Sequence, residues 1–297
     1  MLKIVLSIGG GGKGSENFAR MAGNAEARER FAHSARALVD EYGLDGIDSM
    51  STPPSSVSLQ CEICSPHRSF LLTSRPFFLL VDWEYPANPQ QGKNYVNLLS
   101  FLRLYLPRSH YIITAALPAH TWALQNIDLR PASHYVDFIN LMTYDFTGPW
   151  SQTSGHHAQL YSQSESELSC QSGIEYLLGQ SVPSNKILLG IPLFGRSFVG
   201  ATARGQPFTG HAGEEGTFEI RDLPRPGSHE YVDEQACAAY CVDDEAGFVT
   251  YDNAHTVAEK ARFAKSVGLG GLFYWTGTAD KEGRNSLVLA GYQALHS

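Results

Sequence analysis

The sequence predicts an α/β protein in which strands alternate with helices, and two observations carry this prediction. Short apolar runs rich in β-branched and aromatic residues recur along the chain, with helical segments between them. Polar or aromatic residues collect at the ends of these runs, as they do at the active-site rim of a (β/α) barrel. A doubly wound open sheet is the alternative, but that fold would usually show a phosphate-binding turn.

The elements can be followed from the N-terminus. The first apolar run, 2–8, ends in the glycines 9–12, which indicates a buried strand entering a tight loop. Residues 25–42 have apolar side chains at helical spacing, and Gly43 follows them as the expected C-cap. A second helix is predicted over 95–106. The remaining predicted strands are 77–81, 111–118, 136–145, 186–196 and 270–276.

Residues 197–253 differ from the rest of the chain in their residue pattern, because Gly, Thr, Phe and Glu alternate here. The segment is too long for a simple loop. Short β-like runs at 216–220 and 247–251 flank a predicted helix near 231–240. We therefore expect a small α+β insertion here. The predicted organisation is a first barrel part, this insertion and a second barrel part, at 1–196, 197–253 and 254–297.

Two acidic residues stand close together at the end of the apolar run that begins at residue 77. Side chains alternate across a strand, so Asp82 and Glu84 should point to one side while Val81 and Trp83 point to the other. Burial and mutual repulsion should raise the pKa of one of these carboxyl groups, which suits a general acid. A surface strand with solvated acids is the alternative, which the aromatic neighbours and Pro86 disfavour.

Charge and hydropathy exclude several classes of partner. The chain has 297 residues and a formal net charge of -8, which argues against nucleic acid or an anionic membrane surface. Neutral substrates fit this charge best, and we expect a monomer. No apolar run is long enough to span a membrane, and residues 1–12 lack a signal-peptide pattern. The segment around the glycines 9–12 has neither the lysine pattern of a Walker phosphate-binding loop nor a GxGxxG motif with a helix directly behind it. We therefore expect no cofactor.

The cysteines predict neither a disulfide framework nor a metal centre. There are 5 of them, irregularly spaced. Cys237 and Cys241 could form a disulfide or could be neighbours on one turn of a helix. Cys61 and Cys64, with His67, have the spacing of half a zinc site, but no second pair of ligands follows at a suitable distance, and we expect no bound metal.

A second acidic segment, 45–48, precedes the first. If Asp48 stood two residues before Asp82, the acids Asp48, Asp82 and Glu84 would share one strand face, and the stretch would read DGIDVDWEYP. That string resembles the catalytic motif of the family 18 glycoside hydrolases, the chitinases, here of the fungal type. Motifs of this family follow in order along the chain: SIGG, DGID with VDWEYP, MTYD, PLFGRSF and GLFYWT.

The resemblance implies a catalytic role for several residues. Glu84 would be the general acid that protonates the glycosidic oxygen, Asp82 would orient the N-acetyl group of the substrate, and Asp48 would be the partner of Asp82 deeper in the strand. Ser7 would support Asp48, and Tyr144 would donate a hydrogen bond to the acetamido group. In this family the acetamido oxygen of the substrate replaces a carboxylate nucleophile, and the anomeric configuration is retained.

The resemblance also implies substrate-binding residues. Asp145 would contact the same sugar as Tyr144, and the face of Trp275 would form an apolar floor on which the pyranose ring stacks. Met142 and Trp275 lie in apolar runs, which without the resemblance would favour core positions. The other candidates for the substrate cleft are Met142, Arg196, Trp83 and Tyr85.

The chain departs from the family pattern in two ways. Its first strand corresponds to strand 3 of the family's barrel, so we expect strands 3–8 of an incomplete (β/α)8 TIM barrel. Residues 49–80 interrupt the catalytic motif, and we interpret them as a translated intron; a surface loop is the alternative. If the segment is present, Leu80 takes the inward position expected for Asp48, and activity should be strongly reduced.

The expected function is that of a chitinase, acting on chitin or chito-oligosaccharides by substrate-assisted catalysis. A chitin-binding lectin of the same fold is one alternative, although such proteins typically have the catalytic glutamate replaced, whereas Glu84 is intact. An endo-β-N-acetylglucosaminidase acting on N-linked glycans is another, although such enzymes generally lack the insertion. Because chitin is extracellular, we expect the complete gene product to be secreted.

Overall fold

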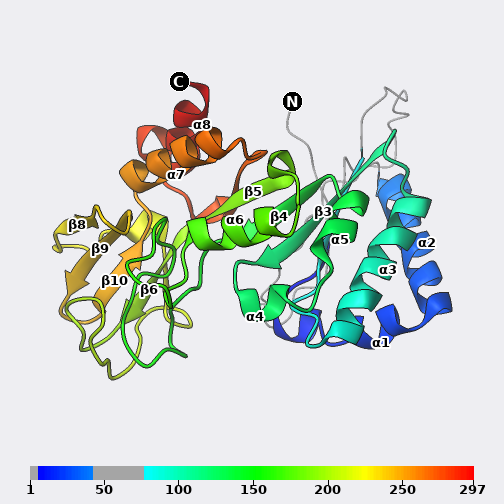
Figure 1. Cartoon of the computed structure of the whole chain (residues 1–297). Helices are drawn as coiled ribbons and strands as arrows, with labels where there is room; N and C mark the ends of the chain where they lie inside the picture. The colour runs from blue at the N-terminus through cyan, green and yellow to red at the C-terminus, as the bar shows by residue number, and fades with distance from the viewer. Residues whose placement is uncertain (1–5, 43–76) are drawn as a thin grey trace. The chain divides into compact units, whose positions relative to one another are not determined.

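The computed structural model describes residues 6–42 and 77–297 (Figure 1). The chain divides into two compact units. Unit 1 comprises Met1–Ala116 and Asn126–Asp137, and unit 2 comprises Leu117–Gln125 and Phe138–Ser297. Asp48, Cys61, Cys64, His67 and most of the predicted insert lie outside the described residues.

Unit 1 is built on three parallel strands, with β2 in the middle. Register pairs Ile8 with Val81 and Gly9 with Asp82 on one side, and Val81 with Ala115 on the other. Helices α2 and α3 lie side by side in this unit (Figure 1). Its strands are β1 (Leu6–Gly9), β2 (Phe77–Asp82) and β3 (Tyr111–Pro118), and its helices are α1 (Phe18–Gly23), α2 (Ala25–Tyr42), α3 (Pro89–Tyr105) and α5 (Leu129–Tyr135).

Local sequence explains where helix α3 begins. Asn88 is its N-cap, and the Asn88 side chain accepts a hydrogen bond from the backbone N–H of Gln91 at 3.0 Å. Pro89 occupies the first turn, where a missing N–H costs nothing. The helix therefore starts six residues earlier than the apolar spacing alone predicts, at Pro89 and not at Tyr95.

Unit 2 also contains three parallel strands, with β5 between β4 and β11. Register pairs Leu141 with Leu189 and Trp275 with Pro192, so the strands end close together. Helices α7 and α8 pack against one another (Figure 1). The strands are β4 (Phe138–Met142), β5 (Ile187–Pro192) and β11 (Gly271–Trp275), and the helices are α4 (Thr121–Leu124), α6 (Cys170–Gly179), α7 (Ala254–Val267) and α8 (Leu287–His296).

The segment after β5 forms an antiparallel sheet of five strands in the order β7-β6-β10-β9-β8. It begins with residues that the sequence assigned to the preceding strand, because β5 ends at Pro192 and a bend at Leu193 separates it from β6. The strands are β6 (Phe194–Phe198), β7 (Thr217–Glu219), β8 (Glu230–Asp233), β9 (Ala238–Asp243) and β10 (Gly247–Tyr251).

The predicted helix near 231–240 is wrong, because this stretch is the hairpin β8–β9. The Asp233 carboxylate accepts hydrogen bonds from the backbone N–H groups of Gln235 and Ala236, which turns the chain back on itself. Tyr231 and Tyr240 then face each other across the strands, with ring centroids 5.3 Å apart. Helical spacing and cross-strand pairing cannot be distinguished in so short a run.

Cys237 and Cys241 form neither of the arrangements that the sequence allowed. Cys237 lies in the turn of the hairpin with a φ of 52°, and Cys241 lies within β9. Both are buried free thiols, as is Cys170. Burial raises the pKa of Cys170 to about 11 and that of Cys237 to about 12, so both thiols stay protonated at neutral pH.

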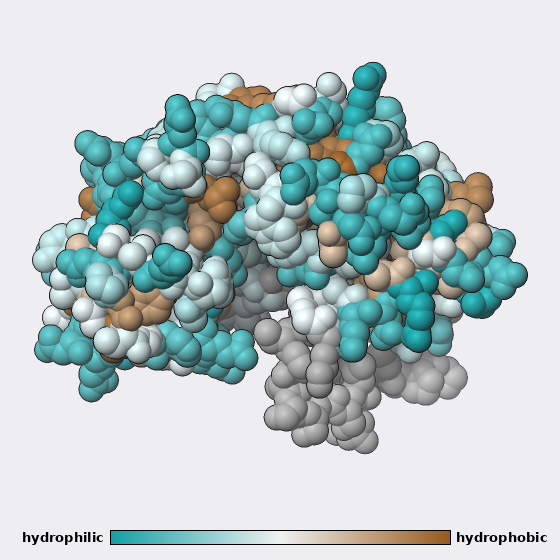
Figure 2. Space-filling view, turned by 60° about the horizontal axis from the view of Figure 1, so that its bottom comes forward, coloured by the Kyte–Doolittle hydropathy of each residue, from teal (hydrophilic) through white to brown (hydrophobic). Residues whose placement is uncertain are grey.

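The α/β class is confirmed, but a closed barrel is not seen. Within each unit the described parallel strands form an open sheet. Among the described residues no helix combines the length and the apolar character that crossing a membrane requires. On the face shown in Figure 2, hydrophilic residues cover most of the described surface and hydrophobic residues form small separate patches.

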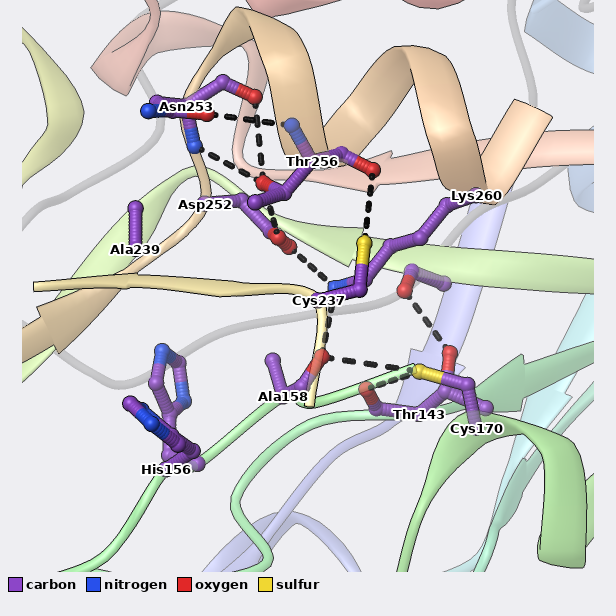
Figure 3. Close-up of polar contacts among 12 residues, drawn as sticks. Thr143, His156, Ala158, Cys170, Cys237, Ala239, Asp252, Asn253, Thr256 and Lys260 are labelled. Atoms are coloured by element: carbon purple, nitrogen blue, oxygen red, sulfur yellow. Dashed lines mark hydrogen bonds and ion pairs between the residues drawn. The ribbon is translucent and has the colours of Figure 1, made fainter. Parts of the chain in front are cut away.

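A buried ion pair lies at the start of helix α7 (Figure 3). Lys260 and Asp252 are 0% and 1% exposed, and Lys260 Nζ lies 2.5 Å from Asp252 Oδ2. The same ammonium group donates to the carbonyl oxygen of Ala158 at 2.5 Å, and the Thr256 hydroxyl donates to Asp252 Oδ1 at 2.7 Å. Burial alone lowers the pKa of Lys260, but the charge of Asp252 outweighs burial and raises it, so the ammonium form persists.

Candidate active site

The acidic pair of unit 1, Asp82 and Glu84, lies at the carboxyl end of strand β2. Asp82 is its last residue and is 0% exposed, and Glu84 follows two residues later, half-buried. The glycine loop after β1 lies beside the Glu84 carboxyl group: a Cβ atom on Gly11 would be 3.5 Å from Glu84 Oε2. Small residues here leave space next to the carboxyl group, as an acid that must reach a substrate requires.

Trp83 belongs to the core of unit 1, contrary to its predicted place in the cleft. It is 2% exposed. Its ring stacks on Phe18 with centroids 5.9 Å apart and meets Tyr95 at 6.0 Å. Because strand side chains alternate, packing of Trp83 into this core leaves Asp82 and Glu84 on the other side of the chain. Tyr85, in contrast, is half-buried.

The buried Asp82 side chain affects the pKa of a neighbouring tyrosine, Tyr95. Tyr95 is also fully buried, and burial followed by the negative charge of Asp82 raises the pKa of its phenol well above the usual range. The Tyr95 hydroxyl therefore stays protonated and can only act as a neutral group near this carboxylate.

Leu80 occupies the place two residues before Asp82 on the same face of β2. It is 2% exposed, and register pairs it with Ser7 of β1. The buried Ser7 hydroxyl has no hydrogen-bond partner among the described residues. The continuous strand 77–82 thus puts an aliphatic side chain two residues before Asp82, on the strand face that Asp82 shares.

In unit 2 the predicted site residues gather where the three parallel strands end. Met142 closes β4, and Tyr144 and Asp145 follow it. Trp275 closes β11 and is half-buried, whereas Met142 and Tyr144 are 7% and 5% exposed. The carboxyl ends of parallel strands are the usual place of active sites in α/β folds.

Asp145 has an unusual backbone conformation, and its carboxylate lies beside two basic side chains. Its φ of 60° lies in the left-handed region, which non-glycine residues rarely adopt. Arg196 Nε donates to Asp145 Oδ1 at 2.8 Å, and His157 Nδ1 lies 3.7 Å from the same oxygen. Burial raises the pKa of Asp145, but the His157 and Arg196 contacts outweigh burial and lower it, so the carboxylate stays ionised.

Aromatic rings surround Arg196 and Tyr144. The Arg196 guanidinium lies 5.0 Å from the centre of the Trp150 ring and 5.3 Å from that of Phe194. The Tyr144 ring meets the Phe194 ring edge-on at 5.8 Å. Trp150 is 61% exposed, so its ring offers an accessible face beside the ionised pair of Arg196 and Asp145.

The sequence motifs did not predict Trp150, Phe194 and His157 as neighbours of the site. Trp150 follows MTYD at a short distance in the sequence, so its place near the site could have been inferred. His157 could not, because its approach to Asp145 depends on how the loop after β4 folds back. Burial lowers the pKa of His157 despite the opposing charge of Asp145, so its imidazole is neutral at neutral pH.

Comparison with protein families gives a match over most of the chain. The model of the glycosyl hydrolases family 18 matches residues 1–55 and 79–280. The stretch between these two matched segments falls inside the predicted insert at 49–80. The match includes Asp82 and Glu84 in unit 1 and the site residues of unit 2.

Individual relatives agree with the family model. Chitinase 1 of Aphanocladium album is 30% identical over 312 residues, which cover 100% of this chain and 66% of that protein. Endochitinase 1 of Metarhizium robertsii is 31% identical over 303 residues, covering 97% and 64%. The chain therefore spans just under two thirds of the length of these relatives.

Solved structures share the α/β fold. A mutant plant class V chitinase from Cycas revoluta in complex with (GlcNAc)3 superposes with a TM-score of 0.80 at 28% identity, covering 99% of this chain and 80% of that one. A family 18 N-acetylglucosaminidase from Paenibacillus barengoltzii gives 0.77 at 27% identity, covering 99% and 83%. The motifs, the position of the acids and these matches lead to one conclusion: the chain belongs to family 18 of the glycosyl hydrolases.

Proposed function

We propose that this protein is a chitinase that cleaves β-1,4-linked N-acetylglucosamine polymers with retention of anomeric configuration. The observation that carries the proposal is the placement of Asp82 and Glu84 at the carboxyl end of β2, one fully buried and the other half-buried beside a loop of glycines. Chitin or chito-oligosaccharides are the proposed substrates, in line with the names of the relatives.

The proposed chemistry uses one protein acid and the substrate's own amide. Glu84 gives its proton to the glycosidic oxygen as the bond from that oxygen to the anomeric carbon breaks. The acetamido oxygen of the same sugar attacks the anomeric carbon, which gives a cyclic oxazolinium ion. Asp82 orients the acetamido group, and Glu84, now a carboxylate, takes a proton from the water that opens the ring.

In unit 2 we assign sugar binding to Tyr144, Asp145 and Trp275. A phenol hydroxyl can donate to the acetamido oxygen, and a half-buried tryptophan face can stack on a pyranose ring. Arg196 keeps Asp145 ionised and oriented through the contact at 2.8 Å. Met142 is nearly buried, so we assign it to the wall beneath these residues.

Leu80 favours a second candidate function, chitin binding with little turnover. The side chain two places before Asp82 on the same strand face is aliphatic, whereas the resemblance implies an acid at that place. A chain of this kind would bind chito-oligosaccharides through unit 2 and hydrolyse them slowly. An endo-β-N-acetylglucosaminidase has no specific observation in its favour.

The test of this proposal is to incubate the purified chain with chitohexaose and follow the products by proton NMR from the first minutes. A retaining chitinase gives the β-anomer first, which then equilibrates with the α-anomer. First formation of the α-anomer would contradict the substrate-assisted mechanism, and binding without any product would leave the second candidate. We also propose that the protein acts outside the cell, where chitin is found.

A further inference from the structure

We propose that Ser15 is a positioning residue that fixes the backbone of Glu84, the proposed general acid. This inference rests on the proposed function and adds to it a residue that lies outside the family motifs quoted above. Ser15 follows the glycine loop after β1 and is 7% exposed. All of its contacts described below lie within unit 1.

The need for such a residue comes from the end of the strand ladder. The register of β1 with β2 stops at Gly9 and Asp82, and the amide of Gly10 still donates to the Asp82 carbonyl at 2.9 Å. Beyond this point the chain at Glu84 has left the sheet. A backbone N–H in a partly buried position needs a partner from elsewhere.

Ser15 supplies that partner with its side chain. The backbone N–H of Glu84 donates to Ser15 Oγ at 2.8 Å. The Ser15 hydroxyl in turn donates to the Gly10 carbonyl at 2.8 Å, with the Asp82 carbonyl a second acceptor at 3.3 Å. One hydroxyl therefore joins the end of β1, the last residue of β2 and the amide of the acid, across 69 positions in sequence between Ser15 and Glu84.

Glycine makes this approach possible at two positions. Gly9 has a φ of 126°, and a Cβ atom there would lie 2.0 Å from the Asp82 carbonyl oxygen. A Cβ atom on Gly14 would lie 2.4 Å from the Gly9 carbonyl oxygen. The loop can close tightly enough to place Ser15 over Asp82 only because neither residue has a side chain.

A hydrogen bond to the backbone of an acid controls where its carboxyl group stands. Proton transfer requires the carboxyl oxygen to lie within hydrogen-bond reach of the glycosidic oxygen, and a misplacement of about 1 Å can cost about 10²-fold in rate. Ser15→Ala removes the acceptor for the Glu84 N–H but leaves the Glu84 carboxyl group chemically unchanged. We expect the effect to fall on the acid-dependent step.

The experiment compares Ser15→Ala with Ser100→Ala on two substrates. Ser100 is the matched control in unit 1, because its hydroxyl donates to the Asn97 carbonyl within α3 at 2.7 Å. One substrate is chitotetraose, whose sugar leaving group must be protonated. The other is a chitobioside with a dinitrophenolate leaving group, which departs without a proton.

We expect Ser15→Ala to lower kcat on chitotetraose by about 10²-fold and to change the rate of dinitrophenolate release in the first turnover, which needs no proton from Glu84, by less than about threefold. Ser100→Ala should leave both unchanged. An equal loss on both substrates would mean that Ser15 only supports the fold, and no loss on either would mean that it does not position the acid. Either result overturns the proposal.

Amide hydrogen exchange at Glu84 separates this proposal from the proposed function. In Ser15→Ala the Glu84 amide should exchange at least about tenfold faster than in Ser100→Ala, since it has lost its acceptor. If the chain and its variants hydrolyse nothing, the chitinase proposal fails and the exchange rate alone decides on Ser15. Unchanged exchange in Ser15→Ala would show that the serine does not hold this amide.

Discussion

Replacing Glu84 by glutamine is expected to lower kcat/KM on chito-oligosaccharides by about 10²–10⁴-fold, the range that general acid catalysis supplies. Glutamine has nearly the same shape as glutamate but has no carboxyl proton to give. Because Glu84 is half-buried beside the glycine loop, the amide should fit without a change in fold. The measurement is steady-state kinetics on chitotetraose.

The control for this variant is Glu29→Gln, which removes an exposed carboxylate of the same unit. Glu29 lies on α2 and accepts a hydrogen bond from the Tyr105 hydroxyl at 2.8 Å. The Glu29→Gln variant should leave kcat/KM on chitotetraose unchanged. Full activity of Glu84→Gln would remove Glu84 from the mechanism and with it the proposed chemistry.

Replacing Lys260 by methionine is expected to lower the free energy of unfolding by about 3–5 kcal/mol, the cost of leaving one member of a buried ion pair alone. Asp252 is 1% exposed and would lose its partner at 2.5 Å, and the Ala158 carbonyl would lose its donor as well. Methionine keeps an unbranched side chain, one heavy atom shorter than that of lysine, but carries no charge. Denaturant unfolding followed by fluorescence measures the loss.

Two further variants decide whether the charge is responsible. Lys265→Met removes an exposed lysine from the same helix and should change stability by no more than about 0.5 kcal/mol. The double variant with Lys260→Met and Asp252→Asn removes both charges, yet keeps an oxygen that can accept from the Thr256 hydroxyl. It should be more stable than Lys260→Met alone. A double variant that is less stable would assign the loss to packing.

Much of the fold could be predicted because the hydrophobic pattern there is unambiguous. The prediction at 111–118 has the bounds of β3 (Tyr111–Pro118), and that at 25–42 has the bounds of α2 (Ala25–Tyr42). Long apolar runs and sustained helical spacing reflect burial directly. The hairpin at Tyr231 and Tyr240 was missed because its strands are short and are specified by a turn and by pairing across strands.

The candidate site was predictable only where a motif carries it along the chain. Asp82 and Glu84 lie where the alternation of β2 puts them, and Asp145 follows β4 as expected. Ser15 contacts Glu84 and His157 contacts Asp145 because of how loops fold. No local sequence pattern predicts such contacts. Trp83 was misassigned because alternation shows which side it faces but not that Phe18 and Tyr95 cover that side.

The central claim is that this chain holds the catalytic acids of a family 18 chitinase but that residues 49–80 separate Asp48 from the strand it should complete. The most direct measurement is kcat/KM on chitotetraose for the 297-residue chain and for a variant without 49–80, in which Asp48 is joined to Val81. We expect the shortened chain to be faster by about 10²-fold or more, and Asp48→Asn to abolish the gain there while leaving the full chain unchanged. A folded shortened chain that is no faster than the full one, or a full chain that already turns over at the typical enzyme rate of about 10 per second, would contradict the claim.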